Sequence, residues 1–150
     1  MGKAVTKMAD EPKGLLIQEK IEAMIDYAEN EVARWPRFYR DSLGIRILNQ
    51  CYALSDMCDE ANSEYYKKPK IKQVDLMNKS LQRMVRRANR SKFVTRKREE
   101  RQLLTLHKYI TWSGLLVEIG KMVGAWYKWA ASLPPPPKRG SKSTPTKDQQ

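Results

Sequence analysis

The chain has 150 residues, of which 41% are apolar and 31% are charged, so it is long enough to form one globular domain around one hydrophobic core. Its formal net charge is +12. Charged residues interrupt every apolar stretch before it reaches the roughly 18 residues of a membrane span, and residues 1–12 lack the apolar centre of a signal peptide. We therefore expect a cytoplasmic protein that does not enter a membrane.

The positive charge is concentrated in the middle third of the chain. Residues 67–101 contain 14 basic and three acidic side chains, a net charge of +11. Residues 1–66 contain eight basic and 12 acidic side chains, a net charge of −4. Such an uneven distribution is typical of proteins that bind a polyanion, with nucleic acid as the first candidate and an anionic membrane surface as the second.

Apolar side chains recur every three or four residues over most of the chain. This spacing predicts four helices, at about 13–35, 42–66, 71–91 and 96–133. Short connections between them favour an all-α, antiparallel up-down-up-down four-helix bundle over residues 13–133, and we find no strand-like alternation. Residues 1–12 are expected to be a disordered arm, and residues 134–150 a Pro-rich, basic, disordered tail.

Basic residues dominate the outer face of the third predicted helix and the connection that follows it. Along the helix they have no acidic neighbours for the usual pairs at i,i+4, which indicates a partner outside the fold, although an ordinary solvated face is the alternative. Thr95 is the expected N-cap of the fourth helix. The first and third connections of such a bundle lie at the same end. The candidate nucleic-acid-binding and partner-binding residues are Lys79, Arg83, Arg86, Arg87, Arg90, Lys92, Arg96, Lys97, Arg98, Arg101, Arg37 and Arg40.

The last predicted helix carries a seam of small and apolar residues at steps of three and four: Leu103, Leu106, Ile110, Ser113, Val117, Gly120 and Gly124. Glycine inside a helix costs up to about 1 kcal/mol relative to alanine. Gly120 and Gly124 therefore predict a close approach of another backbone, with two tolerated glycines as the alternative. We expect Gly120, Gly124 and Trp126 to make structural or oligomer contacts.

Four aromatic residues of this helix, Trp112, Trp126, Tyr127 and Trp129, point in more directions than one seam can take. They predict either burial against another chain or a cover over the end of the bundle.

Motifs for metal, cofactor or catalytic chemistry are missing from the sequence. His107 has no acidic residue three or four positions away, so no di-iron pair is present. Cys51 and Cys58 match no zinc spacing, are too far apart on one helix for a disulfide, and are expected to be buried thiols. With no nucleotide-binding fingerprint either, we expect neither an enzyme nor a bound cofactor or metal.

Residues 118–126, Glu-Ile-Gly-Lys-Met-Val-Gly-Ala-Trp, resemble the closing motif of the accessory variability determinant (Avd) proteins of diversity-generating retroelements. The pairs Pro36-Arg37 and Arg46-Ile47, the run at 42–44 (Ser-Leu-Gly), and Leu81 with Arg83 also resemble the family. The likeness covers roughly residues 35–129.

The resemblance implies a bacterial or phage-encoded four-helix bundle that assembles as a basic, barrel-like pentamer. It further implies that the protein binds the reverse transcriptase and the template-repeat RNA of the same retroelement, and so supports mutagenic cDNA synthesis without being catalytic itself. The alternative is a helical scaffold or RNA-binding bundle similar to the proteins encoded in ribosomal RNA intervening sequences.

Overall fold

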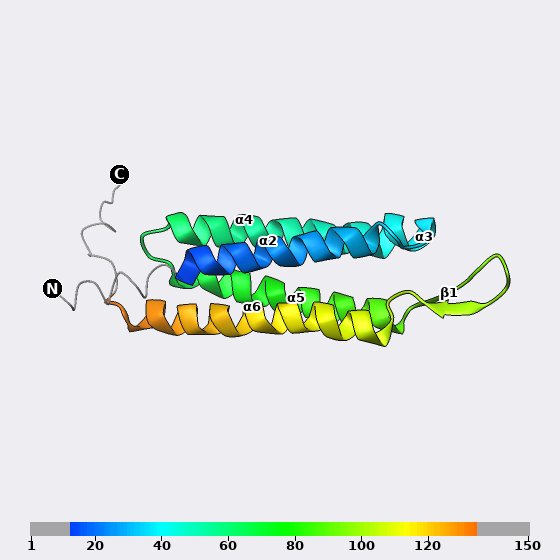
Figure 1. Cartoon of the computed structure of the whole chain (residues 1–150). Helices are drawn as coiled ribbons and strands as arrows, with labels where there is room; N and C mark the ends of the chain where they lie inside the picture. Colours follow the sequence, from blue (N-terminus) through cyan, green and yellow to red (C-terminus); the bar gives the residue numbers. More distant parts are fainter. Residues whose placement is uncertain (1–12, 135–150) are drawn as a thin grey trace.

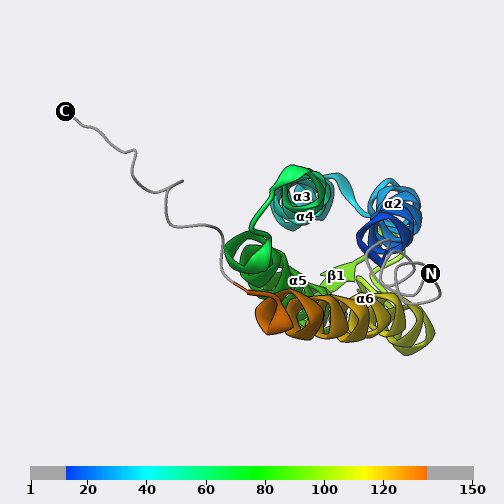
Figure 2. The ribbon, with the colours of Figure 1, turned by 90° about the vertical axis from the view of Figure 1, so that its left-hand side faces the viewer.

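The computed structural model describes residues 13–134, so the arm expected at 1–12 and most of the expected tail lie outside the described residues. Its long helices are α2 (Lys13–Val32), α4 (Ile45–Ser63), α5 (Lys68–Arg90) and α6 (Leu106–Ser132). They run alternately up and down (Figure 1), and each packs against two neighbours in the order α2, α4, α5, α6 around the bundle (Figure 2). The predicted all-α four-helix bundle is confirmed, with one small addition of β structure.

The core consists of the inward faces of these four helices. Burial of apolar side chains is the main force that holds them together. Cys51 and Cys58 are both buried free thiols, as the sequence predicted. The largest fully buried side chains are Trp112, Trp126, Ile17, Ile21, Met24, Ile47, Leu54, Ile71, Leu81, Leu104, Leu116 and Ile119.

Helix α2 ends at Val32, before the predicted boundary at residue 35. The backbone amide of Trp35 donates to the carbonyl of Val32 in a turn that leads into Pro36. The Trp35 side chain is buried, and its indole nitrogen donates to Oε2 of Glu31 over 3.1 Å. The first connection is thus anchored in the core directly after the helix.

The second helical segment begins earlier than predicted, with one α-helical turn, α3 (Arg37–Tyr39), and a π-helical turn, η1 (Arg40–Gly44), that leads into α4. If the spacing of the buried residues of α4 continued backwards from Gly44, Arg40 and Arg37 would face inward. The wider π turn takes up extra chain, so Tyr39 and Leu43 are half-buried and both arginines are exposed.

The predicted start of the fourth helix at residue 96 is wrong. Residues 92–102 form an antiparallel β-ribbon, with β1 (Lys92–Val94) paired to β2 (Glu100–Gln102). The helix begins at Leu106, and its N-cap is Thr105, whose hydroxyl accepts from the Lys108 amide, rather than Thr95. Two effects favour this arrangement: aromatic and β-branched residues at 93–95 suit extended backbone, and cations are unfavourable at a helix N-terminus.

The face of α6 that packs into the core also differs from the predicted seam. Leu106, Ile110 and Val117 are 60%, 59% and 43% exposed. The buried face instead carries Trp112, Leu116, Ile119, Val123, Trp126 and Ala130. Apolar residues lie on most sides of this helix, so helical spacing alone does not decide which face is buried. The face with the large tryptophans, Trp112 and Trp126, is the one that packs into the core.

Neither seam glycine lies against another backbone within residues 13–134, although Gly120 lies close to a side chain of α5. A Cβ on Gly124 would have no atom within 4 Å, and one on Gly120 would lie 3.2 Å from the side-chain nitrogen of Asn78. The tight approaches are at Gly14, where a Cβ would collide with the side chains of Asn62 and Trp126, and at Gly44, where it would lie 2.6 Å from Cγ1 of Val32. Trp112 and Trp126 are fully buried in the chain's own core, so the prediction that they pack against another chain is wrong for these two residues.

Candidate nucleic-acid interface

The outer face of α5 presents arginines without carboxylate partners. Arg83, Arg86, Arg87 and Arg90 are all exposed, and no carboxylate oxygen of residues 13–134 lies within 4.0 Å of their guanidinium nitrogens. Lys79 differs, because it forms an i,i+4 pair with Asp75 at 3.1 Å, which the sequence analysis had overlooked. The unpaired part of the predicted stripe therefore begins at Arg83.

Part of this positive charge stabilises the helix itself. Arg87 and Arg90 lie in the last turn of α5, where a cation interacts favourably with the helix dipole by about 0.3–1 kcal/mol. Arg83 and Arg86 lie further from the end, where this effect has largely decayed. Their position without a carboxylate partner is the clearer indication of an external anion.

The β-ribbon has a tight turn at its tip. The Thr95 amide donates to the Glu99 carbonyl, and the Arg98 amide donates to the Thr95 carbonyl, over 2.8 and 2.9 Å. Arg98 has a φ of 63° and is the one non-glycine residue with positive φ among residues 13–134. This left-handed conformation costs a side-chain-bearing residue roughly 1–2 kcal/mol relative to right-handed backbone. An arginine thus occupies a position that glycine would fill with less strain.

The base of the ribbon is fixed to the bundle at several points. The Leu103 amide donates to the Ser91 carbonyl over 2.8 Å, and the amide nitrogen of the Asn89 side chain donates to the Leu104 carbonyl over 2.9 Å. Leu103 and Leu104 are buried. The Tyr39 hydroxyl, from the first connection, donates to the Lys92 carbonyl over 3.0 Å. The tip consequently projects from a fixed base beyond the helices (Figure 1).

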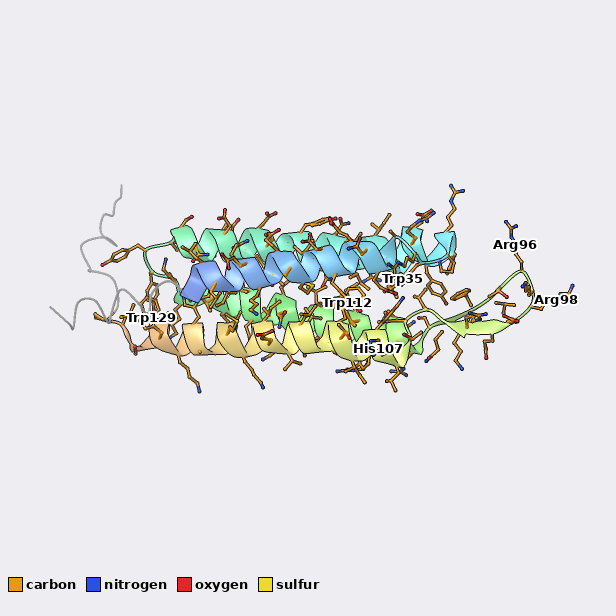
Figure 3. The ribbon with its side chains drawn as sticks, viewed as in Figure 1. Trp35, Arg96, Arg98, His107, Trp112 and Trp129 are labelled. Carbon is orange, nitrogen blue, oxygen red and sulfur yellow. The ribbon has the colours of Figure 1, made fainter. Side chains whose placement is uncertain are left out.

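Charges on the ribbon are paired at its strands and unpaired at its tip. Lys92 lies 3.9 Å from Glu100, and Arg101 lies 2.8 Å from Glu99. Within the described residues the three basic residues of the turn, Arg96, Lys97 and Arg98, have no ion pair. Figure 3 shows Arg96 and Arg98 pointing away from the bundle at the end of the ribbon.

The first connection adds two more basic residues at the same end. Arg37 lies 3.4 Å from Asp41, with both side chains largely exposed, so the pair contributes little to stability. Arg40 is exposed and has no carboxylate partner in the part of the chain that the structure describes. Both arginines lie outside because of the π turn.

The connections α2–α4 and α5–α6 lie at one end of the bundle, as predicted from the topology (Figures 1 and 3). This end gathers most of the predicted site residues, while the arginine stripe of α5 leads towards it. Within residues 13–134, the members of the set without an ion pair are Arg40, Arg83, Arg86, Arg87, Arg90, Arg96, Lys97 and Arg98. The paired members are Arg37, Lys79, Lys92 and Arg101.

Sequence reasoning did not single out two aromatic residues at this end. Phe38, which follows Arg37 in the chain, is 74% exposed. The Tyr39 hydroxyl donates to the Lys92 carbonyl and joins the α2–α4 connection to the ribbon. The two adjacent aromatic residues between Arg37 and Arg40 were visible in the sequence. The π turn, which decides which of these side chains face outward, was not.

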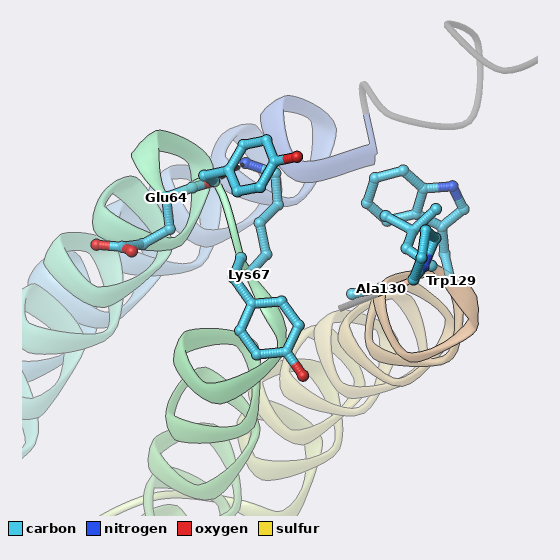
Figure 4. Close-up of a pocket in the computed structure, with 8 residues that line it drawn as sticks. Glu64, Lys67, Trp129 and Ala130 are labelled. Atoms are coloured by element: carbon cyan, nitrogen blue, oxygen red, sulfur yellow. Dashed lines mark hydrogen bonds between the residues drawn. The ribbon is translucent and has the colours of Figure 1, made fainter. Parts of the chain in front are cut away.

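A pocket with aromatic walls lies at the opposite end, between the α4–α5 connection and the end of α6 (Figure 4). Its volume is about 440 Å³, and Tyr65, Tyr66 and Trp129 contribute aromatic walls. Beside them, Nζ of Lys67 donates to the carbonyls of Ala61, Asn62 and Glu64. Lys67 therefore caps the last carbonyls of α4, a structural role for this lysine.

Other chemistry is limited. No group of three or more His, Cys, Asp or Glu side chains in residues 13–134 is arranged to hold a metal ion. Burial raises the pKa of both the Cys51 and the Cys58 thiols to about 12. Among the described helices, none is both long enough and apolar enough to cross a bilayer.

Comparison with known proteins supplies a family. Neither the curated proteins nor the solved structures that were searched gave a match. The family model described as bAvd-like matches residues 15–130, which span all four long helices and the ribbon. The match agrees with the resemblance to Avd proteins in the closing motif and covers well over half of the sequence. The chain therefore belongs to the bAvd-like family.

Proposed function

We propose that this protein is a non-catalytic accessory subunit of a diversity-generating retroelement, which binds template-repeat RNA and the reverse transcriptase of the same element to support mutagenic cDNA synthesis. Membership of the bAvd-like family supports the accessory role. The observation that carries RNA binding is the run of exposed arginines on α5 that lack carboxylate partners in residues 13–134. In this proposal the bundle end and the α5 stripe form one continuous basic surface.

Arginine suits this task because its planar guanidinium can donate two parallel hydrogen bonds to one phosphate. Phosphate contacts of this kind position an RNA without reading its sequence. The ribbon tip extends the basic surface beyond the bundle, so an RNA segment could contact both α5 and the tip. An acidic surface of the reverse transcriptase is the proposed second partner of the same end.

We further propose that the chain assembles as a homo-oligomer, with the pentamer as the form that the family resemblance implies. Support comes from the outer face of α6, where Leu106, Ile110 and Val117 are exposed. Leu15 and Leu16 on α2 are also 64% and 48% exposed. A neighbouring copy packed on these side chains would bury apolar surface that each chain alone leaves in water.

The test of RNA binding is the triple variant Arg83→Glu/Arg87→Glu/Arg90→Glu, measured with radiolabelled structured RNA in a gel-shift titration. We expect binding to be lost while the helical circular dichroism signal is retained, because all three side chains are exposed and the lost helix-dipole contacts of Arg87 and Arg90, about 0.3–1 kcal/mol each, are too weak to unfold the bundle. For the wild-type protein, the logarithm of the binding constant should fall steeply with the logarithm of the salt concentration. Undiminished binding by the triple variant at moderate salt would reject the arginine surface.

A matched control carries the same charge change elsewhere: Lys72→Glu/Lys121→Glu/Lys128→Glu. These lysines are exposed on α5 and α6 and make no ion pair within residues 13–134. We expect this control to bind RNA more weakly through its net charge, yet clearly better than the arginine variant. If wild-type protein fails to bind RNA even at low salt, where attraction is least screened, a protein scaffold is the better description.

A further inference from the structure

One aromatic side chain stands exposed among the basic residues of the ribbon end. Phe38 is 74% exposed, and only Tyr65, at the opposite end, is more exposed among the aromatic residues of the described chain. Phenylalanine has no polar group to hydrogen-bond with water, so its exposure leaves apolar area hydrated. The ring of Phe38 is not part of the hydrophobic core of the bundle.

The surroundings of Phe38 hold it in place. Its ring makes an edge contact with Tyr39, with centroids 5.2 Å apart and planes at 79°. The Ser42 hydroxyl donates to the Phe38 carbonyl over 2.6 Å, and the Tyr39 hydroxyl is bonded to the ribbon. A T-shaped contact leaves at least one ring face uncovered, as the high exposure requires. Phe38 therefore presents an aromatic face to solvent from a backbone that hydrogen bonds hold in place.

Positive charge flanks this open face along the chain. Arg37 and Arg40 are both exposed, and Arg40 lacks a carboxylate partner in residues 13–134. The Tyr39 hydroxyl donates to the Lys92 carbonyl and so joins the α2–α4 connection to the ribbon. The basic tip of the ribbon begins at Arg96, about 13 Å further along extended chain. An exposed ring with cationic neighbours is the combination that binds single-stranded nucleic acid, where bases stack and phosphates pair with basic groups.

We propose that Phe38 is a stacking platform for an unpaired base of single-stranded RNA, with Arg40 and the ribbon tip binding the phosphates on either side. This inference rests on the proposed function and specifies the form of RNA that the basic end takes. A duplex would not use the ring, because its bases are already stacked on one another. A protein partner packed on the ring would not respond to the bases of an RNA strand, so the test below distinguishes the two.

The test compares the wild-type protein with Phe38→Ala by fluorescence anisotropy. Each protein is titrated with a labelled mixed-sequence single-stranded RNA, and with the same strand made abasic at its central positions. We expect Phe38→Ala to weaken binding of the intact strand about ten-fold and to leave binding of the abasic strand nearly unchanged. The slope of affinity against salt should stay the same, because no charge is removed. Equal weakening for both strands would overturn the proposal.

Three controls separate the possible failures. Phe38→Trp keeps an aromatic face and should retain affinity, whereas Tyr65→Ala removes an even more exposed ring at the opposite end and should have no effect. The same strand annealed to its complement should be insensitive to Phe38→Ala. If wild type binds RNA through the α5 arginines but Phe38→Ala behaves like wild type on every probe, the stacking platform is wrong and the proposed function stands. If wild type binds none of the probes, both are wrong.

Discussion

Nζ of Lys108 lies 3.3 Å from Oε1 of Glu31, a carboxylate whose side chain is only 7% exposed. The other oxygen of Glu31 accepts the indole hydrogen bond of Trp35, which contacts Trp112 at a centroid distance of 6.4 Å. Lys108 thus connects the first turn of α6 to the end of α2, next to the basic end of the bundle. This contact fixes α6 where the ribbon returns to the bundle.

Lys108→Met should destabilise the fold by about 1–3 kcal/mol, a decrease in Tm of about 3–10 °C, because it leaves a buried carboxylate with one partner. The lysine is 35% exposed, so water reduces the loss below that of a fully buried pair. Lys108→Arg, which keeps the charge, should retain most of the stability. Thermal unfolding by circular dichroism measures both, and a Tm of Lys108→Met equal to that of wild type would contradict the role assigned to the pair.

Alanine at two glycines should have opposite effects. Gly44→Ala places a Cβ against Val32 and close to the Tyr39 carbonyl, and we expect a loss of about 1–3 kcal/mol from overpacking. Gly124→Ala meets no atom within 4 Å and should gain up to about 1 kcal/mol from helix propensity. Chemical denaturation of the two variants gives the comparison. A destabilised Gly124→Ala would show that this glycine has a close neighbour, such as another copy.

Arg98→Gly should remove a positive charge from the ribbon tip while the conformation of the turn is kept. Glycine tolerates the φ of 63°, so we expect the ribbon to remain and its turn amides to exchange with solvent more slowly. RNA affinity should fall, with the salt slope reduced by about 1. Arg98→Lys keeps the charge and should retain most of the affinity. Unchanged RNA affinity of Arg98→Gly would exclude the tip from the RNA contact.

Ile110→Lys/Val117→Lys should dissociate the proposed oligomer without unfolding the bundle. Both side chains are more than 40% exposed, so the change should alter the stability of one chain by less than about 0.5 kcal/mol. Native mass spectrometry should show lower mass for this variant. Leu76→Lys, on a leucine of similar exposure on α5, is the matched control. An unchanged assembly in the double variant would place the subunit contact on another face.

The buried thiols predict a loss of stability in alkali. Burial raises the pKa of Cys51 and Cys58 from the ordinary value of 9.0 to about 12, so the folded state keeps the thiols protonated where the unfolded chain ionises. Their contribution is complete below pH 9 and is lost as the pH rises towards 12. The free energy of unfolding should decrease over this range, and less steeply in Cys51→Ala/Cys58→Ala. Parallel pH profiles for the two proteins would contradict this assignment.

The sequence was sufficient for the bundle and its topology, because helical spacing in α2, α4 and α5 leaves one face for the core. It failed in α6, where both Ile110 and Trp112 belong to apolar faces and only packing chooses between them. It also failed at residues 92–102, where a three-residue strand leaves too short an alternation to recognise. The turn conformation of Arg98 depends on pairing across that ribbon and is not visible in a local pattern.

The residues of the candidate site could be predicted from the charge pattern of the sequence, whereas their conformation could not. The unpaired arginines of α5 were predictable, since few acidic residues lie near them in the chain. The pair between Lys79 and Asp75 was missed although its spacing is the usual one for helices. The placement of Phe38 could not be predicted, because a single π turn decides which residues of 37–44 face water.

Among the described residues, the ribbon contacts the bundle at its base, through the half-buried Phe93, the buried Leu103 and Leu104, and the hydrogen bond from Tyr39. At the tip, Arg96, Lys97 and Arg98 are exposed and make no ion pair within residues 13–134. Substitutions, and even a longer loop, should therefore be tolerated between Val94 and Glu100 at little expense to folding. Grafting other short turns at this position would be a practical route to altered binding preferences on an unaltered scaffold.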